Sequence, residues 1–138
     1  MTGCVFCKII GGQIPATKVY EDEASLAFMD INPISRGHTL LVPKEHFVRV
    51  SEVDAEKYQA LVKIVPRLTK AVLEATGAAG LNVLQNNGRA AGQVVEHLHI
   101  HLIPRYQGDG LGFIWKPKPA SAEALTELAL KIKSTLAK

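Results

Sequence analysis

Polar and apolar residues alternate most regularly in the segment 97–103, where histidines are separated by leucine or isoleucine. A period of two residues is typical of a β-strand, because successive side chains of a strand point to opposite faces of the sheet. Pro104 lacks a backbone N–H and is predicted to end this strand. The pattern predicts that the apolar residues face a core and that three histidines share the other face: His97, His99 and His101.

Four more short strands are predicted where β-branched, aromatic and other apolar residues lie between turn-forming residues. They cover residues 18–21, 25–30, 38–42 and 81–85. These strands do not alternate regularly with helices, which argues against a doubly wound parallel sheet. We therefore expect an α+β domain with an antiparallel sheet of about five strands.

Helical periodicity is clearest between residues 54 and 75, where apolar residues return every three or four positions and predict one long helix. Ser51 and Asp54 have the spacing of a capping box at its start. Pro66 is expected to kink this helix, because proline cannot donate a backbone hydrogen bond. A short helical turn is predicted over residues 4–10, and Ser121 is expected to cap a final amphipathic helix.

Composition narrows the class of protein. The chain has 138 residues, is 47% hydrophobic and carries a formal net charge of +3, which suits one domain with its own core. The basic residues are scattered, so a nucleic-acid surface is only weakly supported. No apolar segment reaches membrane-spanning length, and the first twelve residues do not resemble a secretory signal. A cytoplasmic location is therefore expected.

The histidine row suggests chemistry, because three titratable groups on one face of an apolar strand are costly to bury without partners. A neutral imidazole is a competent nucleophile near neutral pH, and neighbouring histidines can pass a proton to a leaving group. The glycine-containing loop 86–94 precedes the row and could bring backbone N–H groups to an anion. An ordinary Asn-Gly hairpin turn is the alternative for this loop.

The segment 97–103 also resembles the signature of the histidine triad (HIT) superfamily, in which three histidines alternate with apolar residues. Segments 28–33 and 37–44 and the pair Gly92-Gln93 are similar to that family as well, so the resemblance runs from about Cys4 to Arg105. It implies a HIT domain over residues 1–106, with residues 107–138 as a loop and helix packed on the same domain. It also implies a homodimer in which the sheet is extended across the two subunits.

The same resemblance implies an enzyme that acts at the α-phosphate of a purine nucleotide and passes through a nucleotidyl-histidine intermediate. His99 matches the nucleophile, His101 matches the histidine that contacts the phosphate and assists the leaving group, and His38 matches a supporting histidine. Ordinary core packing is the alternative for His38.

A nucleotide-binding set follows from the resemblance in the same way. Some relatives have serine or threonine where Val94 stands, so only the backbone N–H can serve there. Core packing is an equal alternative for the aromatic and aliphatic residues expected around the base. The matching positions for ribose, phosphate and base, besides His99 and His101, are Asp30, Ile31, Asn86, Gly92, Gln93, Val94, Phe6, Ile9 and Phe28.

The pair Cys4 and Cys7 is a second candidate site. A Cys-x-x-Cys pair could be a redox motif or a chance helical pair, but its flanks do not resemble a thioredoxin-type unit. Thiolates together with imidazoles suit a closed tetrahedral zinc site. Bacterial-type HIT proteins are similar, with a structural Zn²⁺ whose ligands would here be Cys4, Cys7, His46 and His97.

Several alternatives remain at the level of function. The leading hypothesis is hydrolysis or nucleotidyl transfer on a nucleoside phosphoramidate or a dinucleoside polyphosphate, and the long tail after Arg105 favours the polyphosphate class. The alternatives are a nucleotide-binding regulatory or scaffold module with little turnover and an RNA-binding protein, which the few aromatic residues disfavour. The resemblance places the dimer contact at residues 54–75 and 81–85 and Trp115 near the partner's site.

Overall fold

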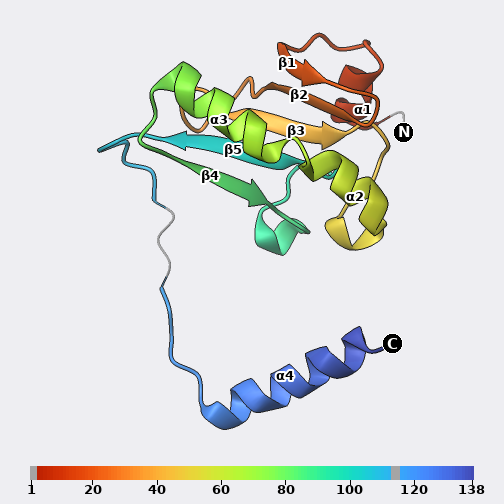
Figure 1. Ribbon diagram of the computed structural model, residues 1–138, viewed down its shortest axis with the longest axis vertical. Coiled ribbons are helices and arrows are strands. Elements are labelled where there is room, and N and C mark those ends of the chain that lie inside the picture. The colour runs from red at the N-terminus through yellow and green to blue at the C-terminus, as the bar shows by residue number, and fades with distance from the viewer. Residues whose placement is uncertain (1–2, 113–115) are drawn as a thin grey trace.

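The computed structural model describes residues 3–112 and 116–138, so Trp115 lies outside the described residues. Five antiparallel strands form one sheet in the order β1-β2-β3-β5-β4 (Figure 1). This confirms the expected α+β class. The strands are β1 (Lys18–Glu21), β2 (Ser25–Met29), β3 (Thr39–Pro43), β4 (Gly80–Gln85) and β5 (Ile100–Arg105). Helices α1 (Val5–Ile10), α2 (Ala55–Val62), α3 (Val65–Thr76) and α4 (Ala122–Leu136) accompany them, with 3₁₀ turns at Val50–Glu52 and Arg89–Ala91.

The central strand β3 is buried along its whole length, and its alternate residues divide the core into two layers. Leu41 belongs to the layer under α2 and α3, together with Leu61 and Leu68. Leu40 and Val42 belong to the opposite layer, which Phe6 of α1 helps to close. The period of two thus places one apolar face under the long helices and the other under the short N-terminal helix.

The predicted long helix 54–75 is wrong in one respect, because it is two helices. α2 ends at Lys63 and α3 follows Ile64, which places Pro66 in the first turn of α3. A proline is tolerated there since the first N–H groups of a helix have no partner within it. Asp54 caps α2 by accepting from the backbone N–H of Lys57 at 2.9 Å, whereas Ser51 lies in the preceding 3₁₀ turn.

The histidine strand is shorter at its start and longer at its end than predicted. β5 begins at Ile100, so His97 and His99 lie in the extended segment before it, and Pro104 does not end it. Pairing with β3 stops at Leu102, while pairing with β4 continues to Arg105. The carbonyl of Pro104 accepts from the hydroxyl of Ser35 at 2.6 Å on the side without a ladder, so no ladder N–H is missed.

The C-terminal helix forms where it was expected. Ser121 caps α4 as predicted, accepting from the N–H of Ala124 at 3.1 Å. Every residue of the helix is exposed, and α4 stands apart from the sheet (Figure 1). The division into a domain 1–106 and an extension 107–138 packed on it stays a prediction. Among the described residues, no helix combines the length and apolar character needed to cross a bilayer.

Candidate functional site

His99 has its ring orientation set by the backbone two residues earlier. Its Nδ1 lies 2.6 Å from the carbonyl oxygen of His97. A carbonyl oxygen can only accept, so Nδ1 carries the hydrogen and Nε2 keeps its lone pair. The ring is 6% exposed, and burial lowers its pKa although the carbonyl of His97 opposes the change. His99 is thus a neutral imidazole with a lone pair on Nε2, which is the nucleophilic form.

His101 and His38 form a hydrogen-bonded pair beside His99. The N–H of Ile34 donates to Nδ1 of His38 at 3.1 Å, so the hydrogen of His38 is on Nε2. That group donates to Nδ1 of His101 at 2.9 Å, which leaves the hydrogen of His101 on its Nε2. The rings of His99 and His101 are 4.8 Å apart, edge to face. We call these three histidines the triad corner: His38, His99 and His101.

The triad corner is held in its neutral state mainly by burial. Burial and the neighbouring His99 and His38 lower the pKa of His101 to about 4. Burial likewise lowers the pKa of His38, and the carboxylate of Asp30, 3.6 Å from Nε2 of His38, opposes that shift. At neutral pH the triad corner therefore keeps a lone pair on Nε2 of His99 beside an N–H on Nε2 of His101, an arrangement suited to nucleophilic attack next to a hydrogen-bond donor.

Residues expected to contact a ribose lie next to this corner. The carboxylate of Asp30 accepts from the backbone N–H of Asn32 at 2.8 Å through Oδ1, so its other oxygen remains near His38. Ile31 is 86% exposed and presents an apolar side chain to any bound molecule. Both positions agree with a sugar-binding edge, and the contact with a nucleotide stays a prediction.

The expected base-pocket residues Phe6, Ile9 and Phe28 are all buried in the core layer on the histidine side. The ring of Phe6 meets His99 edge-on, with 5.1 Å between centroids, and meets Phe28 at 5.5 Å. Core packing therefore accounts for these three residues, and Phe6 also supports the ring of His99. Their contact with a base remains a prediction.

The amide side chain of Gln93 fastens the glycine-containing loop. It is buried and accepts from the N–H of Gly88 at 2.7 Å while donating to the carbonyl of Val48 at 2.7 Å. The side chain thus ties the loop to the segment that contains Val48, and the contact of Gln93 with phosphate stays a prediction. Asn86 is also engaged internally, since its side chain donates to the carbonyl of Gly92 at 3.4 Å.

Val94 is the open position of this loop. Its side chain is 88% exposed, and its backbone N–H donates to no acceptor among residues 3–112 and 116–138. Gly92 has a φ of 92°, a left-handed conformation that glycine adopts without strain and that turns the chain toward Val94. Within the described part of the chain, the loop therefore has an unpaired backbone N–H at Val94, and its contact with phosphate stays a prediction.

Four side chains converge on a second point, which we call the Cys–His corner: Cys4, Cys7, His46 and His97. Nε2 of His97 lies 2.9 Å from the carbonyl oxygen of Pro43 and so carries the hydrogen, which leaves the lone pair on Nδ1. That nitrogen lies 3.1 Å from Nδ1 of His46 and 3.4 Å from Sγ of Cys4. Burial lowers the pKa of His97 to about 4.

The Cys–His corner fits a zinc ion. The four ligand atoms lie within 4.8 Å of one another, and Sγ of Cys7 is 3.3 Å from Nδ1 of His46. A tetrahedron with Zn–N of about 2.0 Å and Zn–S of about 2.3 Å has edges of roughly 3.3 to 3.8 Å. Both cysteines are free thiols at the start of α1, where one helical turn brings them together. The donor types and their spacing are those of a closed structural site.

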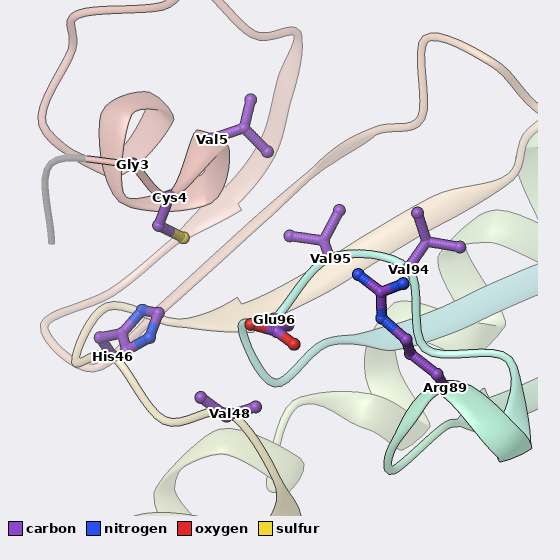
Figure 2. Close-up of a pocket in the computed structure, with 9 residues that line it drawn as sticks. All are labelled: Gly3, Cys4, Val5, His46, Val48, Arg89, Val94, Val95 and Glu96. Carbon is purple, nitrogen blue, oxygen red and sulfur yellow. The ribbon is translucent and has the colours of Figure 1, made fainter.

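A cavity of about 450 Å³ opens beside the Cys–His corner and contains residues that the sequence did not single out. Figure 2 shows Arg89, from the 3₁₀ turn, and Glu96, from the segment before His97, beside this cavity. Cys4 and Val94 line it, whereas His99 and His101 do not. The only sequence signal for Arg89 is its place in the loop after Asn87-Gly88, which does not distinguish it from an ordinary surface arginine.

Comparison with known proteins identifies the family of this chain. A family model described as the HIT domain matches residues 11–108 of the chain. The chain belongs to the HIT family.

HIT proteins of known or assigned activity are among its relatives. It is 50% identical over 114 residues to the protein hit of Bacillus subtilis, covering 82% of this chain and 79% of that one. It is 43% identical over 134 residues to an adenosine 5′-monophosphoramidase of Schizosaccharomyces pombe, covering 96% of this chain and 98% of that one. It is 43% identical over 129 residues to an adenylylsulfatase of Arabidopsis thaliana, covering 94% of this chain but 61% of that one.

Solved structures share the fold of this HIT protein. A crystal structure from Streptococcus mutans covers 99% of this chain and 87% of its own, with a TM-score of 0.95 and 40% identity. A HIT protein from Bacillus subtilis covers 96% of both chains, with a TM-score of 0.91 and 44% identity. A Zn-bound histidine triad protein from Mycobacterium smegmatis covers 98% of both, with a TM-score of 0.75 and 38% identity.

Proposed function

We propose that this HIT protein hydrolyses adenosine 5′-phosphoramidates through a nucleotide covalently attached to His99. The observation that carries the proposal is the hydrogen bond from Nδ1 of His99 to the carbonyl of His97, which leaves the Nε2 lone pair free to attack. The relative from Schizosaccharomyces pombe, named as an adenosine 5′-monophosphoramidase, supports the substrate class.

In the first step, Nε2 of His99 forms a bond to the α-phosphorus while the bond between phosphorus and the amine nitrogen breaks. The N–H on Nε2 of His101, which the hydrogen bond from His38 to Nδ1 of His101 orients, donates a hydrogen bond to the amine nitrogen, and the amine leaves with a proton supplied by the solvent. The ring of His99 gains positive charge as it becomes bonded to phosphorus. Its N–H bond to the carbonyl of His97 then strengthens, because a charged donor makes the stronger hydrogen bond.

In the second step, water attacks the same phosphorus and the bond to His99 breaks. The proton lost by the water passes to the solvent, His99 returns to its neutral form, and adenosine monophosphate leaves. The backbone N–H of Val94 is the candidate donor to the phosphate oxygens in both steps, and Asp30 the candidate acceptor for ribose hydroxyls. These two contacts would hold the phosphorus in reach of His99.

Zinc enters this proposal as a structural ion held by the Cys–His corner. Bound there, Zn²⁺ would supply a closed tetrahedral cross-link with no open coordination position for a substrate. His97 would then be fixed at one end of the histidine segment, and its carbonyl would hold the ring of His99 two residues later. The Zn-bound relative from Mycobacterium smegmatis supports metal binding in this family.

Two other substrate classes remain to be compared with phosphoramidates. The tail after Arg105 suggested dinucleoside polyphosphates, but the Schizosaccharomyces pombe phosphoramidase matches 96% of this chain, so the tail does not separate the two classes. The relative from Arabidopsis thaliana, named as an adenylylsulfatase, adds a substrate class whose leaving group is an anion. Arg89 lines the same cavity as Val94, where its positive charge would attract such a leaving group.

A regulatory or scaffold module with little turnover is the second candidate function. It is disfavoured by the triad corner, because a lone pair on His99 beside an N–H on His101 is not needed for binding alone. A homodimer through the open edge of β4 and a cytoplasmic location remain predictions. β4 has a strand neighbour on one side only among the described residues, and Val83 on it is 51% exposed.

The test is a substrate panel of adenosine 5′-phosphoramidate, adenylyl sulfate and diadenosine polyphosphates, with kcat/KM measured for each. The proposal expects the phosphoramidate to be the best substrate and a nucleotidyl adduct on His99 to be trapped by quenching at alkaline pH. A protein that binds adenosine monophosphate but turns over none of the three substrates would support the scaffold function instead. An adduct on a residue other than His99 would overturn the mechanism.

A further inference from the structure

Cys4 and Cys7 lie in the first turn of α1 and are the two thiols of the chain. Cys4 is the N-cap of the helix, and its Sγ accepts a hydrogen bond from the backbone N–H of Cys7 at 3.4 Å. Residues three apart at the start of a helix have Cα atoms about 5 Å apart, which lies within the range of about 4.4 to 6.8 Å found for disulfides. The two sulfur atoms already lie within 4.8 Å of each other, so rotation of the side chains can join them without moving the backbone.

The two sulfur atoms are within reach of a small oxidant. Both cysteines are partly exposed, and Cys4 lines the cavity of about 450 Å³ beside the Cys–His corner. Figure 2 shows Sγ of Cys4 directed away from α1, toward the side of the cavity that Val95 and Glu96 form. Hydrogen peroxide is little larger than water, so a cavity of this volume admits it.

Metal binding would keep both sulfur atoms in their reactive form. A thiol that coordinates zinc is deprotonated, and the thiolate is the form that attacks a peroxide oxygen. The first attack gives a sulfenic acid, which a neighbouring thiolate converts into a disulfide. Since the chain has two cysteines and they share one helical turn, each is the resolving partner of the other.

Oxidation would replace a long-range cross-link with a local one. With metal bound, the Cys–His corner joins α1 to His46, 39 residues from Cys7, and to His97, 93 residues from Cys4. A disulfide between Cys4 and Cys7 closes a loop around only Val5 and Phe6, so it restricts the unfolded chain far less. The two histidines that remain are half of a closed four-ligand site and would hold zinc weakly. The oxidised chain therefore loses the metal and a tie between α1 and two distant segments.

Helix α1 also bears on the triad corner. Phe6 lies between the two cysteines in sequence, and its ring meets that of His99 edge-on, with 5.1 Å between centroids. A helix of six residues depends on tertiary contacts for its stability. Loss of the metal would thus loosen the element that supports the ring of His99.

We propose that Cys4 and Cys7 are a site of reversible oxidation by hydroperoxides, at which a disulfide forms and the metal of the Cys–His corner is released. With hydrogen peroxide, two electrons pass from the two thiolates to the oxidant, the S–S bond forms and the O–O bond breaks. Two protons from the solvent complete two water molecules, and zinc departs as the free ion. A dithiol reductant with zinc reverses the change. The proposal rests on the proposed zinc site and not on the proposed reaction.

The test uses the zinc-bound, full-length protein with hydrogen peroxide as the probe. Peroxide should release one equivalent of zinc per chain, measured with a chromogenic chelator, and should lower the mass of the chain by two hydrogen atoms. Oxidation of methionine raises the mass instead, so the loss identifies the disulfide. A dithiol with zinc should restore both the mass and the metal content.

Cys7→His is the matched control, because histidine keeps a metal ligand at this position and removes the second thiol. Peroxide should release zinc from C7H at least tenfold more slowly than from the parent, and Cys4 should form no bond within its own chain. Should C7H bind no zinc, the melting temperature of the parent gives a second measurement. It should fall by roughly 10 °C or more on oxidation, to the value of the chelated parent, and recover with dithiol and zinc.

Three results would overturn the proposal while leaving the zinc site in place. They are retention of zinc by the parent in excess peroxide, release of zinc without the loss of two hydrogen atoms, and equal rates of release from C7H and the parent. A protein isolated with no zinc would overturn the proposal together with the zinc site. Turnover of a nucleotide enters none of these measurements, so the proposed reaction stands or fails separately.

Discussion

The Cys–His corner and the triad corner use the same residue type for different purposes, although His97 and His99 are only two residues apart. His97 ties its Nε2 to the carbonyl of Pro43 and aims the Nδ1 lone pair at two thiols and another imidazole. His99 ties its Nδ1 to the carbonyl of His97 and keeps the Nε2 lone pair. The backbone acceptor thus decides which ring nitrogen keeps its lone pair. The lone pair of His97 is suited to a metal, and that of His99 to a phosphorus atom.

His99→Ala gives the largest expected effect and separates the corners most sharply. Removal of the nucleophile should lower kcat by roughly 10⁴-fold or more, because the covalent step is lost. The Kd for adenosine monophosphate should change less than about fivefold, since that ligand needs no attack. Rapid-quench kinetics and calorimetric titration measure the two quantities.

The melting temperature is the control for this variant, because His99 also packs on Phe6. H99A should keep its zinc content, which the Cys–His corner determines. Wild-type turnover in H99A would remove the assignment of the nucleophile, and loss of zinc from H99A would mean that the two corners are not separable.

Loss of metal from the Cys–His corner should act on stability more than on chemistry. Chelation, or Cys4→Ala with Cys7→Ala, should lower the free energy of unfolding by roughly 4 kcal/mol or more, because a structural zinc ion contributes folding free energy directly. The kcat of the remaining folded protein should fall less than tenfold. Urea unfolding with metal analysis checks the first statement, and kinetics normalised to folded protein check the second.

A metal-free preparation whose melting is unchanged by chelation would show that the Cys–His corner holds no zinc. A kcat that vanishes while the melting temperature stays high would instead give the metal a part in the reaction.

The pH dependence of stability should report the triad corner through His101. Its pKa is about 4 in the folded chain against an ordinary value of 6.5, so it is neutral in both states above pH 6.5 and contributes nothing there. Below pH 6.5 the unfolded chain binds a proton that the folded chain does not, and the free energy of unfolding falls toward pH 4 by about 3 kcal/mol. Urea unfolding between pH 4 and pH 7.5 measures this slope.

His101→Gln removes one titrating group and should make that part of the profile less steep, while His38, His97 and His99, whose pKa values are also lowered by burial, still contribute. An identical slope in H101Q and the parent would mean that His101 is not buried in its neutral form.

The sequence predicts a feature of these two corners where the contact that determines it involves residues close together in the chain, and not where that contact is distant in sequence. The alternation in 97–103 predicts that the histidines share a face, and the resemblance to the HIT family names the four residues of the Cys–His corner. The tautomers were not predictable, because the carbonyl that fixes His97 belongs to Pro43, which is 54 residues away. The break before α3 was missed because helical periodicity is the same whether Pro66 interrupts a helix or lies in its first turn.

The same limit applies to α4 and to the glycine-containing loop. An amphipathic pattern shows that α4 has a face to bury but not which molecule buries it. The resemblance places Gln93 beside a phosphate, yet its partners are the N–H of Gly88 and the carbonyl of Val48. A side chain that closes a loop and one that touches a ligand have the same sequence signature.

Gln93 and Val94 give the smallest expected effect and test how the loop serves the triad corner. Gln93→Ala leaves the N–H of Gly88 and the carbonyl of Val48 without their side-chain partner, which should cost about 2 kcal/mol of stability and raise KM several-fold by loosening the loop. Val94→Ala changes an 88% exposed side chain and keeps the backbone N–H, so kcat/KM should stay within twofold. Thermal unfolding and steady-state kinetics on both variants measure the contrast.

Gln93→Glu sharpens this test, because a carboxylate can accept from Gly88 but cannot donate to Val48. It should therefore melt below Q93A, because a buried carboxylate would face the carbonyl oxygen of Val48 without a donor between them. If Q93A instead lowers kcat/KM by a hundredfold with no loss of stability, the side chain of Gln93 contacts the substrate after all. The backbone N–H of Val94 would then not be the main contribution of the loop to phosphate binding.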